Sequence, residues 1–247
     1  MNITFKDRTV LITGATRGIG KAMAGLFEKA NANLILTGTN KKEIEKLNAQ
    51  SENPWKKYFV LDFGSESSIN SFIKKLKSYH QIDVCINNAG INIIDEFIDS
   101  KNKDYNSMMN INLKGPYLLN KYCAAKMKDN GYGRIVNICS IWSAITRPKR
   151  ALYTMTKNAL HGMTQTMAVE LAMHNILVNS VSPGFTLTEL TKSTNSKQEI
   201  ESISEKIPIK RMADPKEIAK VIMYLASEQN SYLTGQNIIV DGGYVIV

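Results

Sequence analysis

Short apolar runs alternate with segments of helical periodicity along the whole 247-residue chain. The helical segments carry apolar residues three or four positions apart, as at Ile69, Phe72 and Leu76. The runs that read as buried strands cover residues 10–13, 34–37, 58–61, 84–87, 134–138, 177–181 and 238–240. Strands that alternate with helices form βαβ units. We therefore predict a single α/β domain over residues 1–247, a doubly wound parallel sheet of about seven strands with helices on both faces.

Three glycines follow the first predicted strand and precede a helical pattern. Gly14, Gly18 and Gly20 can form a tight turn there, because they have no side chain. Backbone N–H groups and the positive end of the helix can then approach a phosphate closely. The turn is therefore a candidate nucleotide-binding loop; the alternative is a purely structural turn.

A tyrosine and a lysine lie four positions apart, in Tyr153-Thr-Met-Thr-Lys157. On a helix this spacing puts both side chains on one face. A fixed cation beside a phenol favours the phenolate, which helps the phenol to transfer a proton near neutral pH. Ser140 lies thirteen positions before Tyr153 and adds a hydroxyl. The sequence thus predicts a proton-transfer site linked to a nucleotide site.

Five motifs in this order resemble those of the short-chain dehydrogenase/reductase family, over essentially the whole chain. They are Gly14-x-x-x-Gly18-x-Gly20, Asn87-Asn-Ala-Gly90, Ser140, Tyr153-x-x-x-Lys157 and Pro183-Gly184. The resemblance implies a Rossmann-like fold, a nicotinamide dinucleotide and oxidoreduction at CH–OH or C=O groups. Family members are generally homotetramers, and we expect one here, with the long helices over residues 105–128 and 153–174 paired across an interface.

The resemblance implies four catalytic residues: Asn112, Ser140, Tyr153 and Lys157. Ser140 would hydrogen-bond the substrate carbonyl, Tyr153 would protonate it, and Lys157 would assist Tyr153 and hold the nicotinamide ribose. Ser143 is a rival for the serine role, and the thirteen-residue offset favours Ser140. A non-catalytic protein on this scaffold would usually lack one of the four, so we expect an enzyme.

Asn112 has a physical argument of its own. Pro116 has no N–H, so the carbonyl of Asn112 lacks its usual helical partner. That carbonyl could hold a water that links Lys157 to solvent, the relay attributed to this position in the family. The alternative is a proline that merely curves the helix.

The cofactor is expected to be NADP(H). Gly38 stands about where NAD-dependent members of the family carry an aspartate, and Arg17 stands where NADP-dependent members often place a basic residue. Thr39, Asn40 and the lysines after them could bind a 2′-phosphate; Arg17 could instead be a solvated surface residue. By resemblance, Asp62 would hold the adenine, Asn88 to Gly90 the adenosine ribose, and Thr188 the carboxamide. The expected cofactor-binding residues are Gly14, Thr16, Arg17, Gly18, Ile19, Gly20, Thr39, Asp62, Phe63, Asn88, Ala89, Gly90, Tyr153, Lys157, Pro183, Gly184, Thr186 and Thr188.

The substrate is less well defined. The chain most resembles 3-oxoacyl-[acyl-carrier-protein] reductases, but Gly131 and His174 stand where those enzymes often carry docking arginines. A basic cluster, Arg147-Pro-Lys-Arg150, lies between Ser140 and Tyr153. It would suit an anionic substrate, such as a phosphorylated or nucleotide-linked sugar, or form salt bridges at a subunit interface. Sugar or polyol oxidoreduction is therefore the alternative function.

The segment 185–210 is rich in Thr, Ser, Lys and Glu, and its helical signals are short. A long loop in a compact domain is usually functional or mobile. Because it follows Pro183-Gly184 directly, we predict a substrate lid; a disordered insertion is the alternative.

Composition excludes several other functions. The net charge of +9 comes from dispersed lysines without interleaved aromatic residues, which argues against nucleic-acid binding. No apolar run reaches the roughly 20 residues of a membrane span, and no signal peptide precedes the first strand, so we expect a cytoplasmic protein. The three cysteines have no metal-like spacing and are expected to be reduced. His80, His161 and His174 are scattered, so no catalytic metal is expected.

Overall fold

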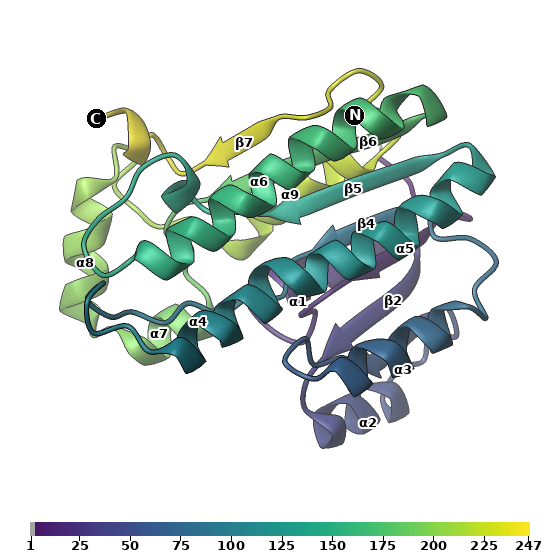
Figure 1. Cartoon of the computed structure of the whole chain (residues 1–247), viewed down its shortest axis with the longest axis horizontal. Helices are drawn as coiled ribbons and strands as arrows, with labels where there is room; N and C mark the ends of the chain where they lie inside the picture. The colour runs from purple at the N-terminus through teal and green to yellow at the C-terminus, as the bar shows by residue number, and fades with distance from the viewer. Residues whose placement is uncertain (1–2) are drawn as a thin grey trace.

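The computed structural model describes residues 3–247, apart from the side chains at positions 190 and 194. It contains a seven-stranded sheet in the order β3-β2-β1-β4-β5-β6-β7, and every neighbouring pair is parallel (Figure 1). The strands are β1 (Thr9–Ile12), β2 (Asn33–Gly38), β3 (Lys56–Val60), β4 (Val84–Asn87), β5 (Gly133–Ile138), β6 (Ile176–Pro183) and β7 (Asn237–Val240). Each one overlaps a predicted strand.

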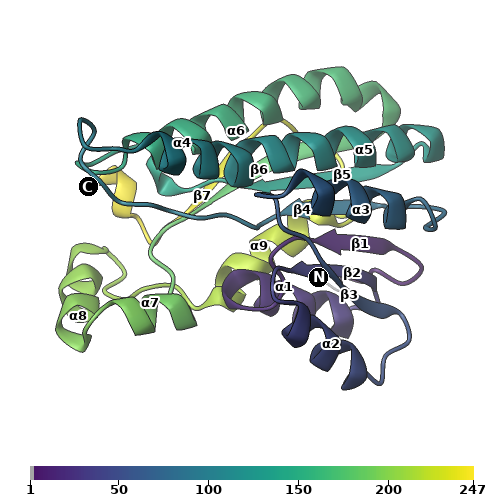
Figure 2. The ribbon, with the colours of Figure 1, turned by 60° about the horizontal axis from the view of Figure 1, so that its bottom comes forward.

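Helices cover both faces of the sheet, which confirms the predicted doubly wound fold (Figure 2). One face carries α1 (Gly18–Lys29), α2 (Lys41–Ala49) and α9 (Pro215–Ala226). The other carries α3 (Glu66–Leu76), α4 (Asn102–Met109), α5 (Gly115–Asn130) and α6 (Ala151–Leu171). Short 3₁₀ helices lie at Ile141–Ser143, Ala172–His174 and Tyr244–Ile246.

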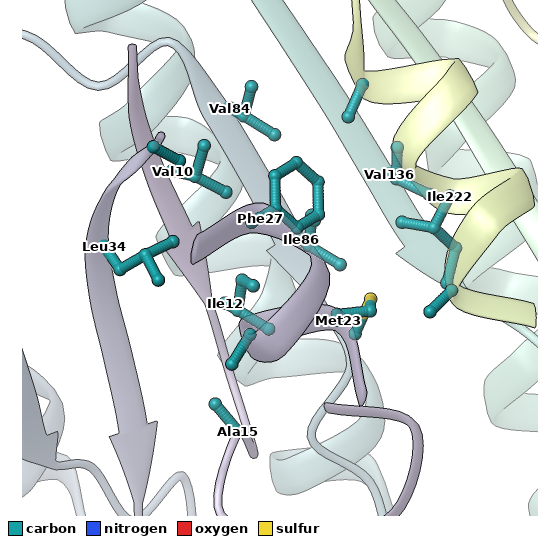
Figure 3. Packing of buried hydrophobic residues seen from close by; sticks show 14 of the residues in the cluster. Val10, Ile12, Ala15, Met23, Phe27, Leu34, Val84, Ile86, Val136 and Ile222 are labelled. Atoms are coloured by element: carbon teal, nitrogen blue, oxygen red, sulfur yellow. The ribbon is translucent and has the colours of Figure 1, made fainter. Parts of the chain in front are cut away.

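Two hydrophobic cores result from the period-two alternation of the strands. Val10 and Ile12 point toward α1, which contributes Phe27, and Ile222 of α9 joins the same core beside Val136 (Figure 3). Leu11, between them in the sequence, belongs to the core beneath α3, α5 and α6. Successive residues of a strand therefore pack against helices on opposite faces of the sheet. Within residues 3–247, no helix is long and apolar enough to cross a bilayer.

A π-helical turn, Asn110–Lys114, joins α4 to α5 into one continuous helical segment. The N–H of Gly115 donates to the carbonyl of Asn110, five residues earlier, and the next residue, Pro116, has no N–H to donate. The sequence predicted a local break in helical bonding here, but not a π turn. A Cβ on Gly115 would lie 2.4 Å from the Phe63 ring, so this close approach requires glycine.

Residues 185–210 form two short helices, α7 (Glu189–Thr194) and α8 (Lys197–Lys206), where a long loop was predicted. Both start at capping residues: the Thr188 side chain accepts from the N–H of Thr191, and Ser196 forms a capping box with Glu199. No residue of α8 is buried, so local capping rather than core packing defines this helix. A lid role for the segment stays a prediction.

Several apolar residues on the two long helices lie in the core of their own chain. Leu119, Cys123, Met127 and Leu160 are buried there and cannot serve an interface. Large apolar side chains that do reach the surface on these helical segments are Tyr105, Tyr117, Met155, Val169 and Met173. The prediction of a homotetramer therefore depends on this second set.

Candidate active site

The predicted site residues lie at the carboxyl ends of six neighbouring strands or on the helices next to them. Because all strands are parallel, these ends meet at one edge of the sheet. The residues follow β1 (Gly14 to Gly20), β2 (Thr39), β3 (Asp62, Phe63), β4 (Asn88 to Gly90), β5 (Ser140) and β6 (Gly184, Thr186, Thr188). Pro183 ends β6, Asn112 lies in the π turn, and Tyr153 and Lys157 lie in the first turns of α6.

The loop after β1 has backbone geometry that only glycine adopts easily. Gly14 and Gly18 have φ angles of +63° and +55°. A Cβ on Gly20 would lie 2.0 Å from the carbonyl oxygen of Gly14, so any side chain there would displace the loop. The side chain of Arg17, at the N-cap of α1, forms no cap hydrogen bond. The loop thus fits the phosphates of a dinucleotide.

Hydrogen bonds join the loop after β1 to the loop after β4. The Thr13 hydroxyl accepts from the N–H groups of Asn88 and Ala89, both at 3.0 Å. The Asn88 amide donates to the carbonyls of Thr13, at 2.9 Å, and Gly14, at 3.1 Å. Sequence reasoning did not assign a role to Thr13, although it directly precedes the first glycine of the motif.

The end of β2 has no room for a side chain at Gly38 while Thr16 keeps its position. A Cβ on Gly38 would lie 2.5 Å from the methyl group of Thr16, which therefore fills this position. Arg17 and Thr39 are exposed, and Arg17 forms no ion pair within residues 3–247. Asn40, another candidate for phosphate binding, caps α2 by accepting from the N–H of Glu43. Arg17 is therefore an available cation at this end of the sheet, and exposed Lys42 is another without an ion pair within residues 3–247.

The two predicted residues after β3 have structural contacts. The Asp62 carboxylate accepts from the N–H of Gly64 at 2.8 Å, and the residue is exposed. The Phe63 ring is buried against Gly115. Phe63 can therefore contact a cofactor only through its main chain.

Lys157 lies beside Tyr153 on α6, as the helical spacing predicts. Its ammonium nitrogen is 5.6 Å from the centroid of the Tyr153 ring and donates to the carbonyl of Ile138 at 2.7 Å. The residue is only 4% exposed. A Cβ on Gly90 would lie 3.5 Å from this nitrogen and 3.2 Å from Asn112 Oδ1. The loop after β4 therefore closes over both side chains.

Ser140 lies two residues after the end of β5 and is buried. Its hydroxyl oxygen accepts from the N–H of Trp142 at 3.3 Å and has no acceptor for its own proton within residues 3–247. The rival Ser143 donates to the carbonyl of Ser140 at 2.6 Å and also contacts Ser182 and Asn237. Of the two hydroxyls, Ser140 is the one able to donate to a substrate.

The side chain of Asn112 is fully buried and connects the loop after β4 to α6. Its oxygen accepts from the N–H of Ile91 and its nitrogen donates to the carbonyl of Ile91, both at 2.8 Å. The same nitrogen donates to Thr156 at 3.2 Å, and Thr156 donates to the carbonyl of Tyr153 at 2.9 Å. Sequence reasoning missed Thr156, because nothing in the local pattern marks it.

The cysteines offer no reactive thiolate. Cys85, Cys123 and Cys139 are free and buried. Burial raises the pKa of Cys139 to about 11, although nearby Lys157 acts in the opposite direction. The thiol stays protonated at neutral pH and donates to the carbonyl of Lys157. Within residues 3–247, no group of three His, Cys, Asp or Glu side chains could hold a metal ion.

The basic cluster does not form one charged patch. Lys149 pairs with Glu96 at 3.4 Å, and exposed Arg147 lies 5.1 Å from the Trp142 ring centroid. Arg150 lies 5.8 Å from the same ring but is buried. Trp142 in turn packs edge-on against Phe185, which follows Pro183-Gly184.

The chain is similar to known proteins over nearly its full length. The family model described as enoyl-(acyl carrier protein) reductase matches residues 14–245. A 3-oxoacyl-[acyl-carrier-protein] reductase FabG of Rickettsia felis is 36% identical over 99% of this chain and 100% of its own length. An NAD-dependent glycerol dehydrogenase of Listeria innocua is 35% identical over 99% of this chain and 96% of its own length. The solved structure of ElxO with NADP bound matches with a TM-score of 0.90 and 35% identity, covering 97% of this chain and 99% of that chain.

Sequence, fold and family model agree. The region matched by the Rickettsia felis relative covers 99% of the chain, and the matched family model covers residues 14–245. The parallel sheet and its flanking helices match solved structures over the whole chain. This chain belongs to the short-chain dehydrogenase/reductase family of oxidoreductases.

Proposed function

We propose that the protein is an NADP(H)-dependent reductase that converts a ketone to a secondary alcohol, with a 3-oxoacyl thioester on acyl carrier protein as the first substrate to test. The observation that carries the proposal is the group formed by Ser140, Tyr153 and Lys157 at the edge of the sheet that holds the glycine loop. The name of the Rickettsia felis relative supports the substrate class.

The end of β2 and the loop after β1 support NADP(H) over NAD(H). The Thr16 methyl group fills the space of a carboxylate that would repel a 2′-phosphate, and Arg17 is an exposed cation without an ion-pair partner within residues 3–247. The ElxO structure contains NADP, in agreement with this assignment. The Listeria innocua relative is named as NAD-dependent, so the preference needs a direct measurement.

The residues of this chain account for the proton transfer. A bound NADPH would supply the hydride. Ser140 donates a hydrogen bond to the substrate carbonyl oxygen, and Tyr153 gives its phenolic proton to that oxygen as negative charge develops on it. The Lys157 ammonium stabilises the resulting phenolate. Asn112 holds the loop after β4 against α6, so that these groups keep their positions.

Polyol or sugar oxidoreduction is the second candidate. The glycerol dehydrogenase relative supports it, and so does the basic cluster next to Trp142. The chemistry at Ser140 and Tyr153 is the same in both cases, so the substrate alone distinguishes them.

The test follows NADPH absorbance with 3-oxoacyl thioesters on carrier protein and on CoA, and with keto sugars. Tyr153→Phe removes the transferable proton and should abolish reduction while NADPH binding stays near normal. Lys157→Ala should weaken both turnover and cofactor binding. The control Tyr232→Phe changes an exposed phenol and should keep full activity. A Tyr153→Phe enzyme that retains most of its activity would contradict the proposal.

A further inference from the structure

Arg150 is a buried cation without a hydrogen-bond partner for two of its nitrogens. The residue is 7% exposed, and neither Nε nor Nη1 meets an acceptor within residues 3–247. Burying a charged group without a partner is costly. Such groups persist where a ligand supplies the missing partner, which makes Arg150 a candidate binding group.

The immediate neighbours of Arg150 hold it in place but give it no acceptor. Its guanidinium lies 5.8 Å from the centroid of the Trp142 ring, a cation–π distance. Trp142 packs edge-on against Phe185 at 6.3 Å, and Phe185 packs against Tyr244 at 5.1 Å. This aromatic wall, formed by Trp142, Phe185 and Tyr244, orients the guanidinium and leaves its hydrogen-bonding capacity unused.

No acidic side chain neutralises Arg150 within residues 3–247. Glu96, which approaches the basic cluster, pairs with Lys149 at 3.4 Å instead. Burial lowers the pKa of Arg150, Arg147 lowers it further, and Tyr153 acts in the opposite direction. Arg150 therefore lies near a second cation, Arg147 on the same indole ring, and has no carboxylate beside it, a setting that favours binding of an anion.

Arg150 lies close in the chain to the helix that carries Tyr153. It immediately precedes α6, and its carbonyl accepts from the N–H of Thr154 at 2.8 Å. Tyr153 lies one helical turn further along α6. Trp142 follows Ser140 by two residues, and the Ser140 hydroxyl accepts from its N–H. The guanidinium and the two groups that act on the carbonyl are therefore held by the same short segments.

We propose that Arg150 binds a carboxylate of the substrate, so that the ketone reduced at Tyr153 belongs to a small oxo acid. The proposal rests on the proposed ketone reduction but not on its thioester substrate, because a thioester has no free carboxylate. A guanidinium binds a carboxylate through charge-assisted hydrogen bonds. A single buried cation matches one negative charge, which favours a carboxylate over a dianionic phosphate.

The main test compares 3-oxobutanoate and 4-oxopentanoate with their methyl esters, which have the same carbonyl without the charge. Wild-type kcat/KM for each acid should exceed that for its ester by about tenfold to hundredfold, the range of a charge-assisted hydrogen bond. Arg150→Gln and Arg150→Met should remove this preference by raising KM for the acids, while kcat for the esters changes little. The control Arg147→Gln alters an exposed arginine on the same indole ring and should keep most of the preference.

A second measurement does not need turnover. The non-reducible carboxylate succinate should raise the Tm of the wild-type protein and leave that of Arg150→Met unchanged. Without ligand, Arg150→Met should melt at or above the wild-type temperature, because a buried unpaired cation is gone. A Tm lowered by several degrees, with an unchanged response to succinate, would indicate a structural role and overturn the proposal.

The results of these experiments test the carboxylate site at Arg150 separately from the proposed ketone reduction. If the wild type reduces neither acids nor esters, ketone reduction is wrong for these compounds, and the succinate measurement alone decides the role of Arg150. If acids and esters are reduced equally, or Arg150 variants affect both equally, the carboxylate site is wrong and ketone reduction stands. A stronger preference for dihydroxyacetone phosphate over both oxo acids would also overturn it.

Discussion

Replacing Asn112 with alanine should destabilise the protein by an amount that follows from its contacts. The side chain makes two hydrogen bonds to Ile91 at 2.8 Å and one to Thr156 at 3.2 Å. A typical hydrogen bond contributes about 1 kcal/mol, so losing three costs about 3 kcal/mol. For a chain of this size, 1 kcal/mol shifts Tm by about 2–4 °C. We expect Asn112→Ala to lower Tm by about 6–12 °C.

The assay is thermal unfolding of wild type, Asn112→Ala and Asn106→Ala, followed by circular dichroism at pH 7. Asn106 is an exposed residue of α4, on the same continuous helical segment, so its replacement should leave Tm nearly unchanged. If Asn112→Ala melts within about 2 °C of the wild type, the side chain does not hold the loop after β4 against α6. The inferred positioning role would then be wrong.

Three further predictions concern cofactor choice, assembly and pH. Arg17→Ala should erode the preference for NADPH over NADH by about tenfold to hundredfold, mainly through KM, because a charge-assisted hydrogen bond is lost; a wild type that uses NADH equally well would refute the assignment. Sedimentation velocity at micromolar concentration should show a homotetramer, and a stable monomer would exclude a role for Tyr117, Met155 and Val169 in assembly. Burial lowers the pKa of His161, so the unfolded chain binds the proton more readily. Stability should therefore fall as pH drops below about 6.5, and His161→Gln should weaken that dependence in melts between pH 5 and 8.

The fold was largely predictable because the core repeats a simple pattern. Buried strands of parallel sheets are continuous apolar runs, and all seven were found in this way. The helices α7 and α8 were not found, because they lack an apolar stripe and depend on caps at Thr188 and Ser196. The π turn also escaped prediction, since it accompanies the contact between Gly115 and Phe63, residues far apart in sequence.

The candidate site was predictable where backbone conformation restricts the residue type. Gly14, Gly18 and Gly20 stand out because no other residue fits their turn. The contacts of Thr13 with the loop after β4 could not be predicted, because they join residues 75 and 76 positions apart. The burial of Arg150 could not be predicted, because the sequence shows only a basic cluster that would suit either an anionic substrate or a subunit interface.

The strand order has a consequence for how such a protein can change. Because β1 lies beside β4, the sheet has two halves that meet at this pair. The residues that we propose to select the dinucleotide, Thr16, Arg17 and Gly38, come from the first half, and Ser140 and Tyr153 come from the second. Exchange of the amino-terminal half with that of a relative would alter the electron donor and leave the substrate unchanged. Such a chimera would have to preserve the hydrogen bonds between Thr13 and the loop after β4, because they connect the two halves of the sheet.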